Sequence, residues 1–324
     1  MSTVVITGAA ILEELAKKFS TIANGELGNN IRSLLCAGSL VPVNKKDNGI
    51  RPVVLAQTIL NIAAKLLLQH LQATVDTLPL LPQLGVGRQS HGLQAAILTA
   101  QSWAANMENK ILLKLDISNA FNSINRRVIL DNVAIFLPDA LPMTTWCLNG
   151  PSTVWWKSKS ISCTTGVQQG NPLSPLLFDL GLVQMVEAVS TLNQILHLWW
   201  HDDGLLYGEP EKVGTTFALI KQKLSECGLQ LNTSKCEIYS LNQITVPPTL
   251  SGIPVIYDRT LWTYLGAPLV YETVSVFETT GKKSELLLKA IGAISDSLPL
   301  HALNLLRSCA GACRFEHLLN LPYR

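Results

Sequence analysis

Hydrophobic positions along this chain follow two patterns. Apolar residues spaced as on one face of a helix predict helices over about residues 11–19 and 58–71. Between them, the β-branched runs Leu40–Val43 and Pro52–Leu55 flank the polar turn Lys45–Gly49, which predicts a hairpin with a basic tip. Taken alone, such a tip is typical of a solvated surface turn.

The central part of the chain repeats strand and helix signals. Residues 93–107 predict a helix, and Lys110–Asp116 is an apolar run of strand length that ends on a carboxylate. A helical pattern then reaches Leu137. Ser174, as an N-cap, and Pro175, at the first helical position, predict the start of a further helix.

A second hairpin is predicted further along the chain. Two strand-like runs, residues 195–200 and 205–207, are joined by a tight turn, and the Asp203-Gly204 pair favours a hairpin there. An amphipathic helix over residues 213–227 and a strand over residues 235–239 follow. Helical patterns continue toward the C-terminus, and no repeat or low-complexity linker divides the chain.

Composition and charge narrow the class of protein. With 48% hydrophobic and 15% charged residues over 324 positions, the chain has the composition of a folded protein. Its 25 basic and 23 acidic residues leave a net charge of +2, which by itself does not indicate nucleic-acid binding. Seven cysteines without a CxxC pair favour a reduced, intracellular compartment over a disulfide framework. No run approaches the roughly 20 apolar residues of a membrane helix, so no membrane partner is expected.

Asp116, Asp202 and Asp203 form the candidate catalytic group. Asp-Gly is common hairpin chemistry, so Asp202 and Asp203 taken alone are explained by a surface turn. If the strand that ends on Asp116 lies beside that turn, three carboxylates repel one another unless divalent cations neutralise them. Such a site suits Mg²⁺, and two ions about 3.5–4 Å apart can support an in-line phosphoryl transfer.

Several motifs follow one another in a characteristic order. They are LVPVNKKDNGIRPVVL, LLKLDISNAFNSINR, GVQQGNPLSPLLF, WWHDDG, GLQLNTSKCEI, TYLGAPL and LLRSCAGACRFEHLLNLP. In that order they resemble the fingers pattern, motifs A, B, C and D, the primer-grip region and the start of the thumb of a reverse transcriptase of the non-LTR retrotransposon type. The resemblance covers about residues 30–270 before the thumb.

The resemblance implies the residues that hold metal. Asp116, Asp202 and Asp203 would bind two Mg²⁺ ions, with Mn²⁺ as a substitute, and the backbone carbonyl of Ile117 would be a further ligand. Lys235 matches the motif D lysine that donates a proton to the departing pyrophosphate, whereas its plain alternative is a surface lysine.

The resemblance also implies substrate contacts. Lys45 or Lys46, together with Arg51, would contact the triphosphate, where arginine can bind phosphate oxygens in a bidentate manner. Which lysine does so is open.

Three further residues match positions near the incoming nucleotide. Phe121 falls where reverse transcriptases place an aromatic gate against the ribose 2′-hydroxyl, and a core aromatic is the plain alternative. Gln169 and Gly170 would lie beside the incoming nucleotide and the templating base, because a glycine allows close backbone approach.

The motifs depart from the family in two places. Trp200-His201 stands where the family usually has Tyr or Phe followed by a small or apolar residue, and Asn171 stands where many relatives carry Asp. No endonuclease, zinc-knuckle or RNase H segment and no complete thumb is recognisable.

The expected fold is α+β, a right-hand polymerase with an antiparallel palm sheet. The fingers would span about residues 1–104, the palm with interleaved finger helices about 105–270, and a partial thumb about 271–324. The expected function is RNA-directed DNA synthesis, in which dNTPs are added to a DNA or RNA primer on an RNA template.

Two alternatives remain open at this stage. One is a catalytically inactive or domesticated remnant that only binds nucleic acid. The other is an RNA-dependent RNA polymerase, against which Phe121 argues because such an enzyme should recognise the 2′-hydroxyl rather than block it. The family alone implies action in the nucleus, and the sequence does not indicate an oligomeric state.

Overall fold

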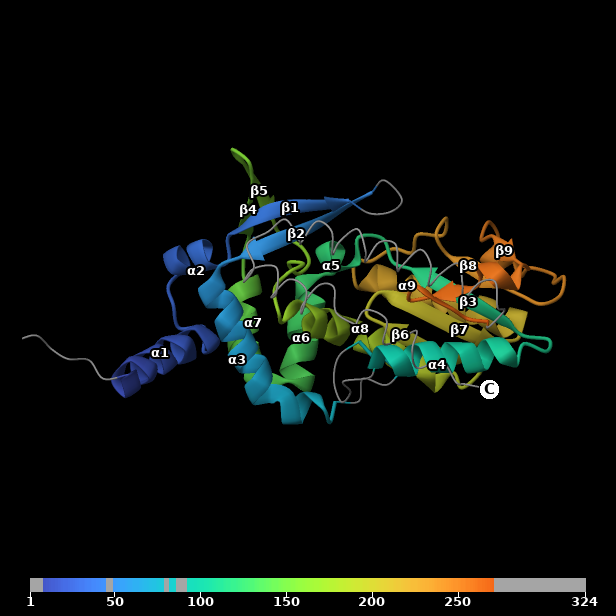
Figure 1. The fold of residues 1–324 in the computed structure, drawn as a ribbon, viewed down its shortest axis with the longest axis horizontal. Helices are drawn as coiled ribbons and strands as arrows, with labels where there is room; N and C mark the ends of the chain where they lie inside the picture. The colour runs from blue at the N-terminus through green and yellow to red at the C-terminus, as the bar shows by residue number, and fades with distance from the viewer. Residues whose placement is uncertain (1–7, 45–48, 79–81, 86–91, 271–324) are drawn as a thin grey trace, which may run out of the picture. The chain divides into compact units, whose positions relative to one another are not determined.

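The structure is a computed structural model that describes residues 8–44, 49–78, 82–85 and 92–270 (Figure 1). The chain divides into two compact units, each assembled from three stretches of sequence. The first unit takes residues 1–89, 117–192 and 218–231, and the second takes residues 90–116, 193–217 and 232–324. Lys45, Lys46, the predicted C-terminal helices and the predicted thumb lie outside the described residues.

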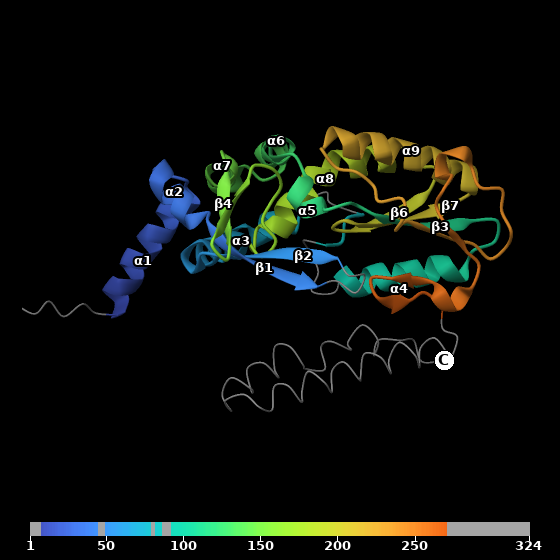
Figure 2. The ribbon, with the colours of Figure 1, turned by 90° about the horizontal axis from the view of Figure 1, so that it is seen from above.

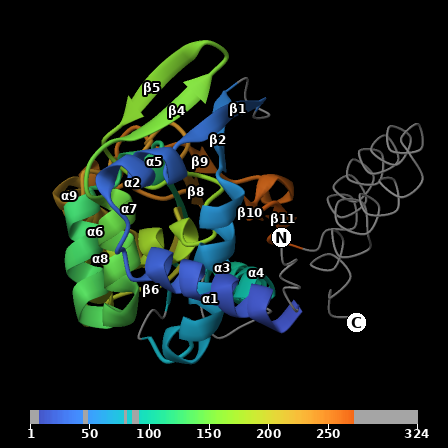
Figure 3. The ribbon, with the colours of Figure 1, turned by 90° about the vertical axis from the view of Figure 1, so that its left-hand side faces the viewer.

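A four-stranded sheet forms part of the first unit. Its strands, in the order β2-β1-β4-β5, are β2 (Ile50–Ala56), β1 (Gly38–Asn44), β4 (Ser152–Trp156) and β5 (Lys159–Cys163). β1 and β2 form the antiparallel hairpin that the sequence predicted. β4 and β5 form a second hairpin, and β4 runs parallel to β1. Figure 3 shows the two hairpins side by side.

The other elements of the first unit are helical. They are α1 (Gly8–Ala23), α2 (Asn29–Leu35), α3 (Thr58–Val75), α5 (Ala120–Ser123), α6 (Arg126–Phe136), the 3-10 turn η1 (Pro138–Ala140), α7 (Leu141–Leu148) and α8 (Ser174–Thr191). α8 is apolar and buried around most of its circumference, as expected for a central helix. The fully buried Asn132 of α6 donates to the carbonyl of Leu180 at 2.8 Å and accepts from Gln184, so the polar group inside this core is satisfied.

The second unit is built on a five-stranded sheet. Its strands, in the order β6-β7-β3-β8-β9, are β6 (Leu196–Trp200), β7 (Asp203–Gly208), β3 (Ile111–Asp116), β8 (Glu237–Tyr239) and β9 (Val255–Ile256). β3 is central and antiparallel to both neighbours, as expected for a palm sheet. Its apolar residues are buried, which explains why the sequence shows a continuous hydrophobic run rather than an alternation.

Helices and short elements cover this sheet. They are α4 (Gly92–Ala105), α9 (Pro210–Glu226), the 3-10 turns η2 (Pro248–Leu250) and η3 (Arg259–Leu261), and the strand pair β10 (Thr263–Tyr264) and β11 (Ala267–Pro268). Figure 2 shows α4 and the first turns of α9 on opposite sides of the sheet. The rings of Tyr239 and Trp262 stack in the core with centroids 5.6 Å apart. Among the residues described, none of the helices combines the length and the apolar character needed to cross a membrane.

The start of α8 differs from its prediction. Ser174 is the first helical residue, and Leu173 occupies the cap position. The hydroxyl of Ser174 donates to the carbonyl of Gln168 at 2.7 Å. The serine therefore fixes the preceding loop instead of capping the helix.

The turn of the second hairpin also differs from its prediction. The loop consists of His201 and Asp202, and Asp203 already belongs to β7. Gly204 lies opposite Trp199 inside the sheet, where a Cβ on the glycine would be 2.4 Å from the indole ring. Gly204 therefore makes room for the fully buried Trp199 rather than forming the turn.

Candidate active site

The three predicted carboxylates meet at one end of the palm sheet. Asp116 is the last residue of β3, Asp203 is the first residue of β7, and the two are directly opposite in the antiparallel pair. Opposite residues in such a pair have Cβ atoms about 4.5–5.5 Å apart. Asp202 precedes Asp203 in the two-residue turn. The strand register thus brings together carboxylates that are more than 80 positions apart in the sequence.

The negative charges of these carboxylates repel one another. Burial, followed by the negative charges of Asp202 and Asp116, raises the pKa of Asp203 to about 7. Positive charge on Lys114 and His201 acts in the opposite direction but is outweighed. The site therefore carries more negative charge than its protein surroundings stabilise, which is the condition that a bound cation relieves.

The donor set fits a hard divalent cation, because carboxylate oxygens are the ligands that Mg²⁺ prefers. Among the residues described, however, no group of three His, Cys, Asp or Glu side chains is already arranged so that it could hold a metal ion. The metal-binding roles of Asp116, Asp202 and Asp203 therefore stay predictions. Their support is the donor chemistry and the mutual repulsion of the three charges.

The backbone at Ile117 is compatible with its predicted ligand role. An isolated antiparallel bridge pairs Ile117 with Leu231. The hydrogen bonds around this bridge are donated by Asn232 to the carbonyl of Asp116 and by Ser118 to the carbonyl of Gln230, both at 2.8 Å. The bridge thus uses the carbonyl groups of other residues and does not engage that of Ile117.

The unusual residues of motif C shape the turn itself. His201 has a φ of 53°, in the left-handed region that residues other than glycine seldom adopt. The rings of Trp200 and His201 are in edge-to-face contact, with centroids 5.4 Å apart. His201 is therefore part of the fold of the turn that carries Asp202.

Tyr264 is a supporting residue that the sequence reasoning missed. Its hydroxyl donates to the backbone carbonyl of Asp203 at 2.9 Å, from the short strand β10. The side chain is almost fully buried, and burial together with Asp203 and Asp202 holds its pKa well above the usual value, so it remains a donor. The TYLGAPL motif, which contains Tyr264, was the sequence signal for this residue, although the motif did not indicate a hydrogen bond to Asp203.

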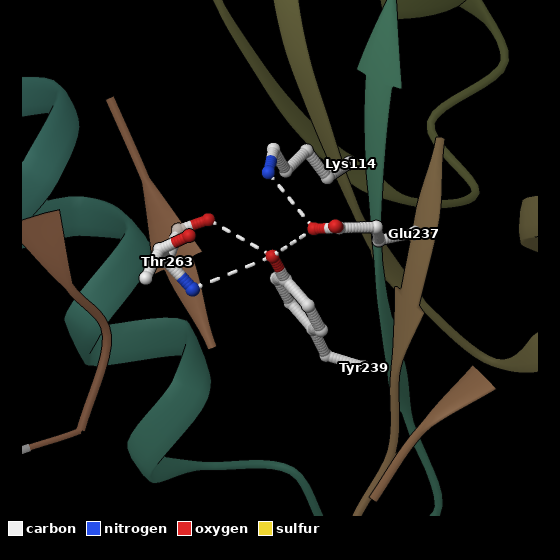
Figure 4. A network of polar contacts seen from close by, with 4 residues as sticks. All are labelled: Lys114, Glu237, Tyr239 and Thr263. Atoms are coloured by element: carbon white, nitrogen blue, oxygen red, sulfur yellow. Dashed lines mark hydrogen bonds and ion pairs between the residues drawn. The ribbon is translucent and has the colours of Figure 1, made fainter. Parts of the chain in front are cut away.

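A polar network joins residues of β3, β8 and β10 (Figure 4). Lys114 of β3 pairs with Glu237 of β8 at 2.8 Å, and the hydroxyl of Tyr239 lies 2.6 Å from the same carboxylate oxygen. The Tyr239 oxygen is also 2.9 Å from the carbonyl oxygen of Thr263 and 3.4 Å from its backbone nitrogen. One hydroxyl proton serves one acceptor at a time, and the charged Glu237 at the shorter distance is the stronger one. The network therefore fixes Lys114, whose charge lowers the pKa of Asp203.

Lys235 lies on an exposed turn of the second unit. Its backbone N–H donates to the carbonyl of Asn232 at 2.9 Å, and Asn232 is itself bonded to the carbonyl of Asp116. The turn that carries the motif D lysine is thus anchored to the backbone of a predicted metal ligand. Its role as a proton donor stays a prediction.

Phe121 belongs to the first unit, where its ring is held in place. It stacks on Phe178 of α8 with ring centroids 4.6 Å apart and an interplanar angle of 16°. Phe178 is fully buried, whereas Phe121 is half-buried. A ring that is packed on one side and partly accessible elsewhere is suited to block a ribose 2′-hydroxyl. The role of Phe121 as such a gate stays a prediction.

Gln169 and Gly170 are joined to the fingers hairpin. Val54 of β2 donates its N–H to the carbonyl of Gln169 at 2.8 Å. Gly170 has a φ of 116°, and a Cβ at this position would lie 2.4 Å from the carbonyl oxygen of Val54. Glycine is therefore required here both by backbone conformation and by space. Arg51 is exposed on the same strand, and its contact with a triphosphate stays a prediction.

Arg126 is a second residue that the sequence reasoning missed. Its guanidinium donates to the carbonyls of Gly166 and Gly150 at 2.9 and 2.8 Å, and to that of Cys163 at 3.2 Å. One side chain thus holds both ends of the β4–β5 hairpin and the start of the segment that carries Gln169. Arg126 is the last residue of motif A, but no local sequence pattern indicates which carbonyl groups it contacts.

The antiparallel pair of β3 and β7, which places one carboxylate at a strand end opposite two adjacent carboxylates on a hairpin, is the arrangement expected of a polymerase palm. Residues 43–269 match the family model described as reverse transcriptase (RNA-dependent DNA polymerase). The chain belongs to this family. The predicted family and fold class are confirmed.

Curated relatives point to retrotransposons. The chain is 25% identical over 248 residues to the SLACS retrotransposable element 132 kDa protein of Trypanosoma brucei gambiense, covering 72% of this chain and 20% of that protein. It is 31% identical over 165 residues to the Pol polyprotein of the R2 element of Nasonia vitripennis, covering 45% of this chain and 16% of that protein. The chain thus matches about a fifth or less of the length of these relatives.

A solved structure supports the fold. Telomerase from Candida albicans, in complex with a fragment of telomeric RNA, matches with a TM-score of 0.51 and 14% identity. The match covers 100% of this chain and 62% of that chain. At this identity the likeness concerns the fold alone, which is that of a right-hand polymerase.

Proposed function

We propose that this chain is the catalytic domain of an RNA-directed DNA polymerase derived from a non-LTR retrotransposon. The observation that carries the proposal is the register of β3 and β7, which places Asp116 opposite Asp203 with Asp202 beside it in the turn. Membership of the reverse transcriptase family supports the same activity. Substrates would be an RNA template, a DNA or RNA primer and dNTPs.

The family uses divalent metal ions, and we propose two Mg²⁺ ions, with Mn²⁺ as a substitute, held by Asp116, Asp202, Asp203 and the carbonyl of Ile117. When bound, such ions lower the pKa of the primer hydroxyl and neutralise the charge that develops on the phosphoryl group. The protein must hold the three carboxylates together against their repulsion. Strand pairing and the bond from Tyr264 to Asp203 accomplish this.

Other side chains would orient the nucleotide. Arg51 presents a guanidinium that can bind phosphate oxygens. The ring of Phe121, which is stacked on Phe178, would exclude a ribose 2′-hydroxyl packed against it. The backbone at Gly170 can approach the templating base closely because it carries no Cβ. Lys235 would donate a proton to the departing pyrophosphate.

Primer extension on an RNA template tests the proposal. With Mg²⁺ or Mn²⁺ we expect dNTP incorporation by the wild type and a loss of about 10²–10³-fold or more in Asp202→Ala. Asp131→Ala is the matched control, because Asp131 is an exposed carboxylate on α6 that pairs with Arg127 of its own helix. Absence of metal-dependent extension from a folded wild type that still binds template would contradict the proposal and favour the inactive remnant.

Sugar selection tests the role of Phe121 and separates the two polymerase classes. Wild type should prefer dNTPs, and Phe121→Val should raise rNTP incorporation at least about tenfold relative to dNTP, because the smaller side chain leaves space for one more oxygen. A wild type that prefers rNTPs would instead indicate an RNA-dependent RNA polymerase.

A further inference from the structure

The β4–β5 hairpin presents two tryptophan side chains to solvent. Trp155 is 49% exposed and Trp156 is 40% exposed, although tryptophan is usually buried over most of its surface. Trp156 is partly covered, because the ammonium of Lys157 lies 5.2 Å from its ring centroid. Successive strand residues point to opposite faces, so Trp155 lies on the other face, opposite the small Ser160. Its indole ring is therefore accessible to a planar ligand.

Trp155 continues a row of residues across one face of the four-stranded sheet. The register places Leu55 of β2 beside Ser39 of β1, and Ser39 beside Trp155 of β4. Leu55 is 60% exposed, so apolar surface is accessible at both ends of the row. Two strand spacings of about 4.8 Å separate Leu55 from Trp155, or about 10 Å in all.

The charge of this sheet favours a polyanion. The four strands and the turn between β4 and β5 contain the basic residues Arg51, Lys157 and Lys159 and no aspartate or glutamate. Arg51 occupies the same face as Leu55, four positions away on one strand. Exposed aromatic surface beside basic side chains is a combination that binds single-stranded nucleic acid, through stacking of bases and neutralisation of phosphates.

The outer edge of β2 adjoins the segment predicted to contact the templating base. Val54, next to Leu55 on β2, is bonded to the carbonyl of Gln169, and Gly170 is packed against its carbonyl oxygen. The segment lies one further spacing beyond β2, so a strand that leaves it across the sheet reaches Trp155 after about 14 Å. A few nucleotides span that distance, because phosphates in a duplex strand recur about every 3.4 Å along its axis.

We propose that Trp155 stacks on a base of the unpaired RNA template, a few nucleotides ahead of the templating base. The identity of the strand as template rests on the proposed function. Binding of a single strand to Trp155 requires no catalysis and can be measured alone.

Binding of an unstructured, fluorescein-labelled 20-nucleotide oligouridine, followed by anisotropy without metal or dNTP, tests the stacking. Trp155→Ala should weaken binding about tenfold, and Trp155→Phe should retain most of the affinity because a ring is preserved. Ile135→Ala is the matched control, since Ile135 is a 66% exposed apolar residue on α6 of the same unit, and it should bind as the wild type does. Wild-type affinity in Trp155→Ala, with a wild-type thermal transition, would overturn the inference.

Two further measurements separate this inference from its rivals. In primer extension, Trp155→Ala should raise the template KM about tenfold with kcat unchanged. If the wild type does not extend primers but Trp155→Ala still weakens RNA binding, the proposed function fails and the single-strand site stands. If Trp155→Ala changes the molar mass in light scattering and leaves RNA affinity unchanged, the face joins copies of this chain and the inference is overturned.

Discussion

Gly170 faces the backbone carbonyl of Val54 so closely that a Cβ on the glycine would lie 2.4 Å from that oxygen. Its φ of 116° also lies where L side chains are strained. We expect Gly170→Ala to lower the free energy of unfolding by more than about 1–3 kcal/mol, the typical cost of backbone strain alone. Urea unfolding measures this change, and the dNTP KM should rise because the Gln169 segment must move away from β2.

Gly252→Ala is the matched control for Gly170→Ala. Gly252 has a φ of 86°, but no atom lies within 4 Å of the position that a Cβ would take, so the substitution introduces strain without a clash. The difference in the free energy of unfolding between the two variants gives the cost of the close contact with the carbonyl oxygen of Val54. Equal losses of stability would show that the contact with Val54 is not the reason for glycine at position 170.

The mutual repulsion of the three carboxylates predicts that they lower the free energy of unfolding when no metal ion is bound. In EDTA at neutral pH, Asp203→Asn should raise the free energy of unfolding by about 1 kcal/mol or more, because a buried charge opposite Asp116 is removed. The same variant should lose primer extension. Asp131→Asn, at an exposed ion pair, should show no such gain.

Addition of Mg²⁺ provides the second half of this experiment. Binding to the folded state raises the melting temperature, so the wild type should be stabilised more than Asp203→Asn. If the wild type and the variant respond equally, the carboxylates are not the site at which the ion binds.

The network in Figure 4 predicts coupled losses of stability. Tyr239→Phe removes a buried hydroxyl bonded to Glu237, and we expect a loss of about 1–3 kcal/mol in the free energy of unfolding. Lys114→Met leaves Glu237 without its ion pair, and the double variant should lose less than the sum of the two single losses. Additive effects in the double-mutant cycle would show that the two contacts act independently. Tyr257→Phe, at a 45% exposed tyrosine, is the control and should change little.

His197 predicts a dependence of stability on pH. Burial lowers its pKa to about 4, and the indole N–H of Trp199 donates to its Nδ1 at 3.1 Å, which favours the neutral ring. In the unfolded chain the pKa is 6.5, so the unfolded state takes up the proton first as the pH falls. The stabilising contribution is therefore complete above about pH 6.5 and is lost as the pH falls toward 4.

Urea unfolding between pH 7.5 and pH 5 checks this sign. The wild type should lose about 1–2 kcal/mol more than His197→Gln over that range, since the variant has no group at this position to protonate. A loss of the same size in both proteins would assign the pH dependence to other groups.

Much of the candidate site could be predicted from the sequence because its signals are local. The apolar run that ends on Asp116 and the hairpin that carries Asp202 and Asp203 each follow from a few neighbouring residues, whereas Gly170 was assigned by the family resemblance. Local patterns failed where a neighbour in space changed the outcome. Gly204 forms no turn because it must accommodate Trp199 on the adjacent strand.

Other features depend on partners that no local pattern specifies. The parallel pairing of β1 with β4 joins residues more than 110 positions apart, and Lys114 meets Glu237 across 123 positions. Arg126 was not predicted to hold the loop that leads to Gln169, because its acceptors are backbone carbonyls, which every residue carries.

The sequence by itself determined the chemistry of this protein, namely three carboxylates, their order and the strands that carry them. Only the tertiary structure decided that Asp116 lies opposite Asp203 and that Tyr264 donates a hydrogen bond to the backbone carbonyl of Asp203. The physical reason is that periodicity and turn chemistry act over a few residues, whereas strand register is selected by packing of the whole sheet. The exposure of the Trp155 ring was also decided only by the tertiary structure, because it depends on the strand with which β4 pairs.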